Sequence, residues 1–299
     1  MDTSRLEPGP LRVSGGRPHR RAVLAIVSAL GLLATNTGCG PAGDAIVLAA
    51  TTSTYDSGLL DSLVARFKSG HPDYMVRSVV VGSGQALELG RRGDADVLLV
   101  HAPETEERFM ADGHGVDRVP VMYNDFLLVG PANDPAGVRG VLDAASALAT
   151  VAEAGARFVS RGDDSGTHLR EMALWRTAGV SPQGTWYLVS GQGQGTSLQL
   201  ASERGAYTLV DRATFSTFRG LLRLQPLVQG DPSLINLYSV IRTSRAAHPV
   251  RASVFADWLT SEEARLMIAS FGSDEAGYPL YTPLVVGATL PIPSTTPRP

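Results

Sequence analysis

The sequence predicts an α/β protein of two lobes, each a mostly parallel sheet flanked by helices, with two strands that cross between the lobes. Three observations predict this fold class. Apolar runs typical of buried strands alternate with amphipathic helical patterns along most of the chain. The length of 299 residues suits two domains of moderate size. A composition of 43% hydrophobic and 18% charged residues is ordinary for a globular protein.

The first part of the chain alternates between strand and helix. We expect strands at 45–50, 75–81 and 96–100, and helices at 56–69, 86–92 and 103–112. In the first of these helices Leu59, Leu63 and Phe67 recur at helical spacing, so one face is apolar. The helix ends where Gly70 and Pro72 interrupt the pattern.

The second part continues the alternation and closes with two amphipathic helices. We expect strands at 123–129, 157–160, 186–189, 206–210, 224–228 and 236–241, and helices at 141–154, 167–178, 197–204, 214–220, 252–260 and 261–271. In the last two helices the predicted core residues are Trp258, Leu259, Leu266 and Ile268. The chain is expected to cross between lobes at 123–126 and 236–239. Lobe I therefore comprises 45–122 and 237–285, and lobe II comprises 123–236. Residues 286–299, rich in Pro, Ser and Thr, form a flexible tail.

The N-terminal segment has the pattern of an export signal. Five arginines precede an apolar run at 22–34 that is too short to span a bilayer as a stable helix. The chain's single cysteine, Cys39, follows this run directly. We therefore interpret 1–38 as a signal peptide and 39–44 as a linker, and we favour a lipid anchor on Cys39 over cleavage near Gly38 to a soluble form. The protein is expected to be exported to the periplasm or the cell surface.

Net charge narrows the class of partner. Without residues 1–38 the chain loses five arginines and two acidic residues, which changes the formal net charge from −3 to −6. A nucleic-acid binder is usually basic, so nucleic acid is not an expected partner. Lys68 is the only lysine, which excludes Schiff-base chemistry and a Walker-type phosphate loop.

Four loops rich in hydrogen-bond donors each lie between a predicted strand and a predicted helix. They span residues 51–57, 82–85, 161–168 and 191–197. Loops at the carboxyl ends of strands, where helices begin, are where α/β proteins bind ligands. The third loop joins Arg161 to Ser165, Gly166 and Thr167, and the free N–H groups of a helix start attract anions. The loops therefore predict an oxyanion site.

Catalytic patterns are weak. Ser165 lacks a Gly-x-Ser-x-Gly nucleophile elbow, and no histidines pair at metal-ligand spacing. Residues 82–87 superficially resemble a dinucleotide fingerprint, but Leu87 occupies its third glycine position. We therefore expect a binding protein without cofactor or metal. Two alternatives stay open: an enzyme acting on a phosphorylated or sulfated substrate through Asp163 and Asp164, and a sensor that signals to a partner.

Long, ordered motifs carry a family resemblance. Residues 48–54, 81–97, 121–126, 160–168 and 207–212 resemble the tungstate-binding periplasmic proteins of ABC transporters, within a similarity that covers about 45–271. The resemblance implies a monomeric, two-lobed binding protein of type II-like fold that captures tungstate, or molybdate, and delivers it to a membrane permease and its ATPase. It further implies an anion-binding set: Thr52, Ser53, Ser83, Arg161, Ser165, Gly166 and Thr167. One difference from the family pattern is Gln194, where we expect an apolar residue.

The related phosphate-binding proteins are the rival interpretation, because they resemble this chain at residues 161–167. Phosphate near neutral pH carries a proton, whose hydrogen a carboxylate can accept. Tungstate and molybdate carry none, so a carboxylate facing them is repelled. An Asp163 that faces the anion favours phosphate, and an Asp163 that pairs with Arg161 favours the metal oxyanion.

Overall fold

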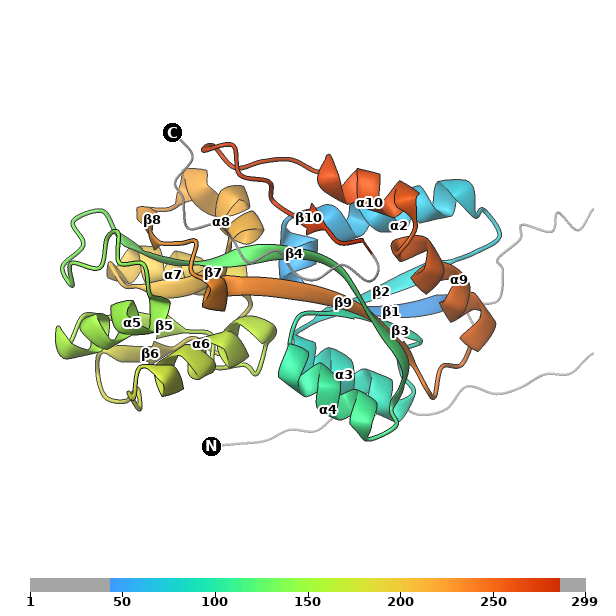
Figure 1. The fold of residues 1–299 in the computed structure, drawn as a ribbon, viewed down its shortest axis with the longest axis horizontal. Coiled ribbons are helices and arrows are strands. Elements are labelled where there is room, and N and C mark those ends of the chain that lie inside the picture. The colour runs from blue at the N-terminus through green and yellow to red at the C-terminus, as the bar shows by residue number, and fades with distance from the viewer. Residues whose placement is uncertain (1–43, 286–299) are drawn as a thin grey trace, which may run out of the picture. The chain divides into compact units, whose positions relative to one another are not determined.

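The structure is a computed structural model that describes residues 44–285 (Figure 1). The predicted signal peptide, Cys39 and the tail at 286–299 lie outside the described residues. The strands are β1 (Ile46–Thr51), β2 (Val76–Val81), β3 (Val97–Val100), β4 (Gly115–Pro131), β5 (Phe158–Ser160), β6 (Tyr187–Val189), β7 (Thr208–Asp211), β8 (Leu224–Val228), β9 (Ile235–Thr243) and β10 (Thr282–Pro283).

The helices follow the strands as the alternation predicts. They are α1 (Thr52–Asp56), α2 (Leu59–Gly70), α3 (Ser83–Arg92), α4 (Pro103–Ala111), α5 (Ala144–Glu153), α6 (Gly166–Thr177), α7 (Gln194–Arg204), α8 (Arg212–Phe218), α9 (Pro249–Leu259) and α10 (Glu262–Ala269), with 3-10 turns η1 (Arg219–Leu221) and η2 (Pro232–Leu234). The α/β fold class is confirmed.

Two sheet regions share the long strand β4. β1 pairs in parallel with β2 and β3, whereas β9 runs antiparallel to β3 and to the first part of β4. The second part of β4 pairs antiparallel with β7 and β8, and β5 pairs in parallel with β6. The sheets are therefore mixed, because the strands that cross between the two halves run against their neighbours.

Two long strands, β4 and β9, pair over most of their length. β4 continues through 17 residues, and Asn124 of β4 lies opposite Asn236 of β9 in the register. Figure 1 shows β4 and β9 running side by side between the two groups of helices. The two halves are thus joined by a hydrogen-bonded ribbon of two strands.

Each half buries an apolar core of its own. In the first half Phe67, Phe255 and Trp258 pack edge to face or stacked beneath the β1 region. In the second half Phe158 of β5 and the fully buried Trp175 of α6 pack edge to face. Aromatic pairs in these geometries add to the stabilisation from buried area. The cores hold the strand ends that carry the candidate loops.

One predicted core residue is wrong, and one predicted helix begins later than expected. Leu266 is 64% exposed, because the buried face of α10 is defined by Ala264 and Ile268, four residues apart, and Leu266 points to the other side. The helix predicted over 56–69 is α2, which begins at Leu59 because Gly58, at φ = 81°, separates it from the short helix α1.

A buried arginine ties the C-terminal segment to the second half. Arg212, at the start of α8, forms a two-pronged ion pair with Asp125 of β4 at 2.6–2.7 Å. Its remaining nitrogen donates to Asp274, which follows α10, at 2.6 Å. These contacts hold the pKa of Arg212 above its ordinary value, although burial acts to lower it.

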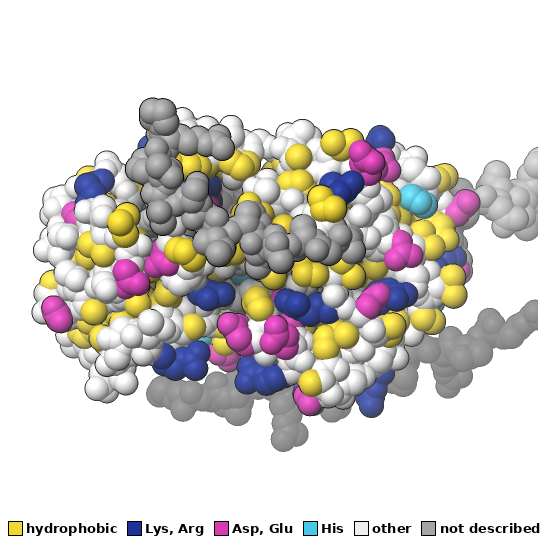
Figure 2. All heavy atoms as spheres, viewed as in Figure 1, with side chains coloured by type: hydrophobic (Ala, Val, Ile, Leu, Met, Phe, Trp, Pro, Cys, Tyr) yellow, Lys and Arg dark blue, Asp and Glu magenta, His cyan; other side chains and the backbone are white. Residues whose placement is uncertain are grey.

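Elsewhere, acidic and basic side chains are interspersed over the face seen in Figure 2, with no stripe of one sign.

Candidate anion-binding site

All four candidate loops contain helix starts in the structure, and in the fourth of them Gln194 begins α7 after β6. Thr52 and Ser53 begin α1 after β1, Ser83 begins α3 after β2, and Gly166 begins α6 after β5. Ser165 is the N-cap of α6, and its hydroxyl accepts from the N–H of His168. The first N–H groups of an α-helix have no partner within the helix, so each start offers backbone donors.

The predicted site residues are buried although nearly all of them are polar. Ser53, Ser83, Arg161, Ser165 and Thr167 are each at most 2% exposed, Gly166 is buried, and Thr52 is half-buried. Buried polar groups are costly unless they are hydrogen-bonded. Where they gather without forming a core, a polar ligand is the usual reason.

The second and third loops are in direct contact. A Cβ added to Gly82 would lie 3.4 Å from the Cα of Ser165, and one added to Gly84 would lie 2.9 Å from the carbonyl oxygen of Asp164. The absence of side chains at Gly82 and Gly84 therefore permits the two halves of the molecule to meet here. Since Asp164 itself has φ = 54°, a sparsely populated conformation for a residue with a side chain, the turn is also locally strained.

Arg161 is held in place from two sides. One terminal nitrogen donates to the Asp163 carboxylate at 2.5 Å, and the other donates to the side-chain oxygen of Gln194 at 3.3 Å. The side-chain nitrogen of Gln194 in turn donates to the carbonyl oxygen of Leu209. Gln194 stands where we expect an apolar residue, and its side chain helps to fix the position of the guanidinium group of Arg161. It also shows that α7 begins three residues earlier than the predicted helix.

The Asp163 carboxylate is turned onto its own loop. Its other oxygen accepts from the backbone N–H of Ser165 at 3.2 Å. Burial acts to raise the pKa of Asp163, but the charge of Arg161 and the bonds from Ser165 outweigh it and hold the pKa below its ordinary value. Asp163 is therefore a negatively charged carboxylate that pairs with Arg161.

Two donors near this ion pair are left over. Among the described residues, neither Nε of Arg161 nor Oγ of Thr167 has a hydrogen-bond partner, although both atoms are buried. Such groups are rare in folded proteins, because leaving one unsatisfied costs about 1–3 kcal/mol. Both residues were predicted to bind an anion.

Polar residues of the 207–212 motif and of α1 have structural roles. Tyr207 donates its hydroxyl to Asp134, and Asp211 caps the start of α8 by accepting from Thr214. Burial raises the pKa of Asp211. Asp56, at the end of α1, has a pKa raised to about 6, mainly by burial and then by the nearby charge of Asp211.

Sequence reasoning missed His101 and its partners. His101 follows β3, is 3% exposed, and shares a hydrogen bond of 2.8 Å between its Nδ1 and the side-chain oxygen of Asn236. Its position directly after a buried strand is the same as that of the candidate loops, which is the signal that could have found it. Its partner is 135 residues away, so no local pattern reveals the pair.

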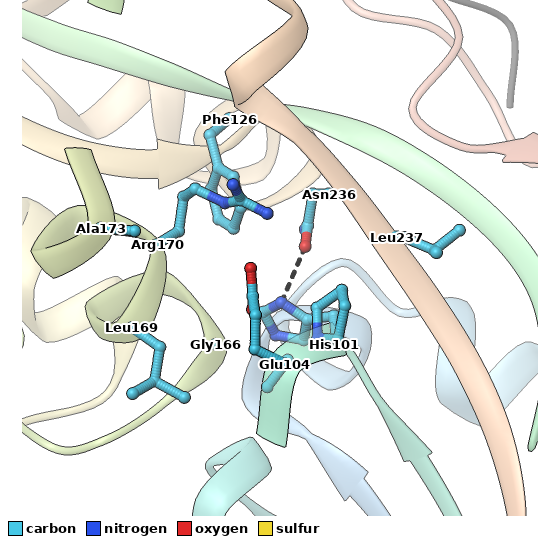
Figure 3. A pocket seen from close by; sticks show the side chains of 11 residues that line it. His101, Glu104, Phe126, Gly166, Leu169, Arg170, Ala173, Asn236 and Leu237 are labelled. Atoms are coloured by element: carbon cyan, nitrogen blue, oxygen red, sulfur yellow. Dashed lines mark hydrogen bonds between the residues drawn. The ribbon is translucent and has the colours of Figure 1, made fainter. Parts of the chain in front are cut away.

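A small pocket opens beside His101, drawn in Figure 3. Helix α6 contributes Gly166 and Arg170, helix α4 contributes Glu104, and the crossing strands contribute Phe126 and Asn236. The pocket is thus bounded by both halves of the molecule. Within residues 44–285, no three His, Cys, Asp or Glu side chains are grouped as a metal site, and no helix has the length and apolarity to cross a membrane.

Comparisons with known proteins give consistent matches over this fold. The family model described as a PBP superfamily domain matches residues 36–263. Tungstate-binding protein TupA of Peptoclostridium acidaminophilum is 42% identical over 282 residues, which cover 88% of this chain and 98% of that protein.

Solved structures of similar proteins agree with the sequence matches. A tungstate ABC transporter structure from Geobacter sulfurreducens is 44% identical, with a TM-score of 0.69 over 76% of this chain and 98% of that one. Tungstate-binding protein TupA from Desulfovibrio alaskensis G20 is 38% identical, with a TM-score of 0.65 over 81% and 99% of the two chains.

Proposed function

We propose, from the premise that this chain belongs to the PBP superfamily and within it to the tungstate-binding proteins of ABC transporters, that it captures tungstate, or molybdate, for import. Its role is that of the solute-binding component, which binds the oxyanion and presents it to the permease and ATPase in the membrane. This role is binding and not catalysis. The two halves, 45–122 with 237–285 and 123–236, are proposed to be the lobes that hold the anion between them.

The observation that carries the choice of anion is the orientation of Asp163. One carboxylate oxygen of Asp163 accepts a hydrogen bond from Arg161, and the other accepts one from the N–H of Ser165. A phosphate pocket needs an acceptor for the hydrogen that phosphate carries near neutral pH, and Asp163, committed in this way and with a lowered pKa, is poorly placed to accept it. The unpartnered Nε of Arg161 and hydroxyl of Thr167 are instead suited to an anion that only accepts hydrogen bonds.

The proposed ligand set follows the loops. The donors come from Thr52 and Ser53 of the first loop, Ser83 of the second, and the third-loop residues Arg161, Ser165, Gly166 and Thr167. Each charge-assisted hydrogen bond contributes about 1.5–3 kcal/mol net, so about seven of them gross roughly 10–20 kcal/mol. Nanomolar binding requires about 12 kcal/mol, and the cost of ordering takes part of the surplus.

Calorimetry of the purified protein with tungstate, molybdate, sulfate and phosphate tests the proposal. We expect saturable heat with tungstate, a weaker or equal signal with molybdate, and none with phosphate. A preference for phosphate, or no heat with tungstate, would overturn it. Sulfate serves as the matched control, because it is also proton-free but has shorter bonds to oxygen.

Binding proteins of ABC importers work outside the cytoplasmic membrane, and we propose that this one acts as a monomer held there by a lipid on Cys39. Supporting this is the position of Cys39 directly after the apolar run of the predicted signal. Mass spectrometry of the membrane fraction measures the modification. An unmodified thiol in the mature protein would refute the anchor without affecting the binding function.

A further inference from the structure

One buried histidine contacts three of the candidate loops. The backbone N–H of His101 donates to the hydroxyl of Ser83 at 3.3 Å, and Nε2 of its ring lies 3.4 Å from the hydroxyl of Ser53. Against the third loop the approach is closest, since a Cβ added to Gly166 would lie 2.5 Å from both Nδ1 and the carbonyl oxygen of His101. Figure 3 shows the ring beside Gly166 with its bond to Asn236.

The position of the hydrogen on this ring follows from its neighbours. The carboxylate of Asp211 is an acceptor, so the amide nitrogen of Asn124 is the group that donates to it at 3.3 Å. The amide oxygen of Asn124 then accepts from the nitrogen of Asn236 at 2.8 Å.

The same logic extends to His101. Because the nitrogen of Asn236 faces Asn124, the oxygen of Asn236 faces Nδ1 of His101 and requires a hydrogen on that atom. The neutral ring therefore carries its hydrogen on Nδ1, and Nε2 is an acceptor.

The hydrogen bonds close into a cycle. The second N–H of Asn236 donates to the hydroxyl of Tyr238 at 3.1 Å, and that hydroxyl lies 3.0 Å from the hydroxyl of Ser53. With Nε2 of His101 as the acceptor from Ser53, the Tyr238 hydroxyl is assigned as the donor to Ser53. The Ser53 hydroxyl donates in turn to Nε2 of His101, whose Nδ1–H returns to Asn236. In this assignment every hydrogen of the cycle has one acceptor, and the Thr51 hydroxyl, 3.2 Å from that of Ser53, is a further donor to Ser53.

We propose that His101 is a positioning residue for oxyanion capture: its neutral, Nδ1-protonated ring sets the spacing of the three loops and draws the hydroxyl hydrogen of Ser53 away from the anion. Ser53 then serves the ligand through its backbone N–H alone. This inference rests on the proposed function and refines the role that the family resemblance implies for Ser53.

The surrounding charges support a neutral ring. Burial lowers the pKa of His101 to about 3, and the positive charges of Arg161 and Arg170 act in the same direction. The bond to Asn236 and the charge of Asp163 act to raise the pKa but do not outweigh burial. The ring therefore stays uncharged throughout the physiological range, so its hydrogen bonds do not change with pH.

Nitrogen NMR of the histidine-labelled wild-type protein tests the tautomer directly. The signal of His101 is assigned by its loss in His101→Asn. We expect the Nδ1-protonated neutral ring from pH 5 to pH 8, with and without tungstate. A hydrogen on Nε2, or titration within that range, would overturn the inference. The measurement without tungstate does not depend on ligand binding, so its outcome is separate from that of the proposed function.

Asn236→Asp tests the coupling between the cycle and the anion. The carboxylate removes both amide donors and favours a protonated His101, so tungstate affinity should gain a pH dependence between 5 and 8 that the wild type lacks. Asn133→Asp is the matched control, since it makes the same change in an exposed loop. An affinity of Asn236→Asp that is as independent of pH as that of the control would contradict the coupling.

Two substitutions of His101 itself separate positioning from folding. His101→Asn retains an N–H near the position of Nδ1 and should lose about tenfold in tungstate affinity, whereas His101→Leu should lose a hundredfold or more. Circular dichroism establishes that each variant is folded. Equal affinities for the two variants and the wild type would refute the positioning role, and a folded His101→Asn supplies the comparison even where Asn236→Asp does not fold.

Discussion

Replacing Arg161 by alanine tests the anion site most directly. The substitution removes the buried Nε–H donor and the terminal N–H groups, a loss of about 1.5–3 kcal/mol for each charge-assisted bond to the anion. It also leaves the Asp163 carboxylate without its partner, so this negative charge repels the dianion, although solvent screens part of the repulsion because Asp163 is partly exposed. Tungstate affinity should fall about a hundredfold to a thousandfold, measured by calorimetry at constant ionic strength.

A double variant isolates the effect of the Asp163 carboxylate that Arg161→Ala leaves without a partner. Arg161→Ala with Asp163→Asn should bind about tenfold more tightly than Arg161→Ala alone, because the repulsion between carboxylate and dianion is gone. Arg157→Ala is the control, since Arg157 is an exposed arginine just before the same strand. If Arg161→Ala binds within about twofold of the wild type, Arg161 does not contact the anion. If the double variant is no better than the single one, Asp163 does not face the anion after Arg161 is removed.

Three further predictions follow from the same contacts. Burial raises the pKa of Glu171 to about 7, so the folded state binds an extra proton and the free energy of unfolding falls as pH rises from about 4.5 through 7. Glu171→Gln should abolish that loss, on the order of 2–3 kcal/mol in urea unfolding at pH 8. The same pH dependence of the unfolding free energy in both proteins would contradict the prediction. Gln194→Leu should release Arg161 and weaken tungstate binding about tenfold in calorimetry, unless the Asp163 pair alone orients the guanidinium. Gly166→Ala should weaken binding at least as much, because its methyl group would overlap His101; wild-type affinity would show that the loops can separate without cost.

The fold was predictable from sequence because its signals are local. β1, β2 and β3 are short apolar runs bounded by turn residues, and the helices after them carry regular apolar spacing. The errors are local as well. Leu266 is an apolar residue in an amphipathic helix, but the periodicity over eight residues is too short to decide which face is buried. Gly58 delays the start of α2 to Leu59, and the donor-rich segment before it, predicted as a loop, forms the short helix α1.

The site was predictable only in part. Arg161 and the helix start at Gly166 were visible because they form one continuous segment, and the loops from β1 and β2 follow the same strand-to-helix pattern. The cycle through His101 was not visible, because its members come from three separated segments and each is an ordinary residue where it stands. Such a network is created by the tertiary fold, and sequence patterns do not encode it.

The pairing of Asn124 with Asn236 also bears on how proteins of this shape can diversify. The chain leaves the first half near Asn124 and returns to it near Asn236. Because these residues are paired in neighbouring strands, the two ends of the segment 123–236 lie side by side. A segment whose ends lie close together can be replaced as a unit without altering the fold of the rest of the protein. Swapping it between relatives that import different solutes would show how much of the choice of cargo travels with that piece.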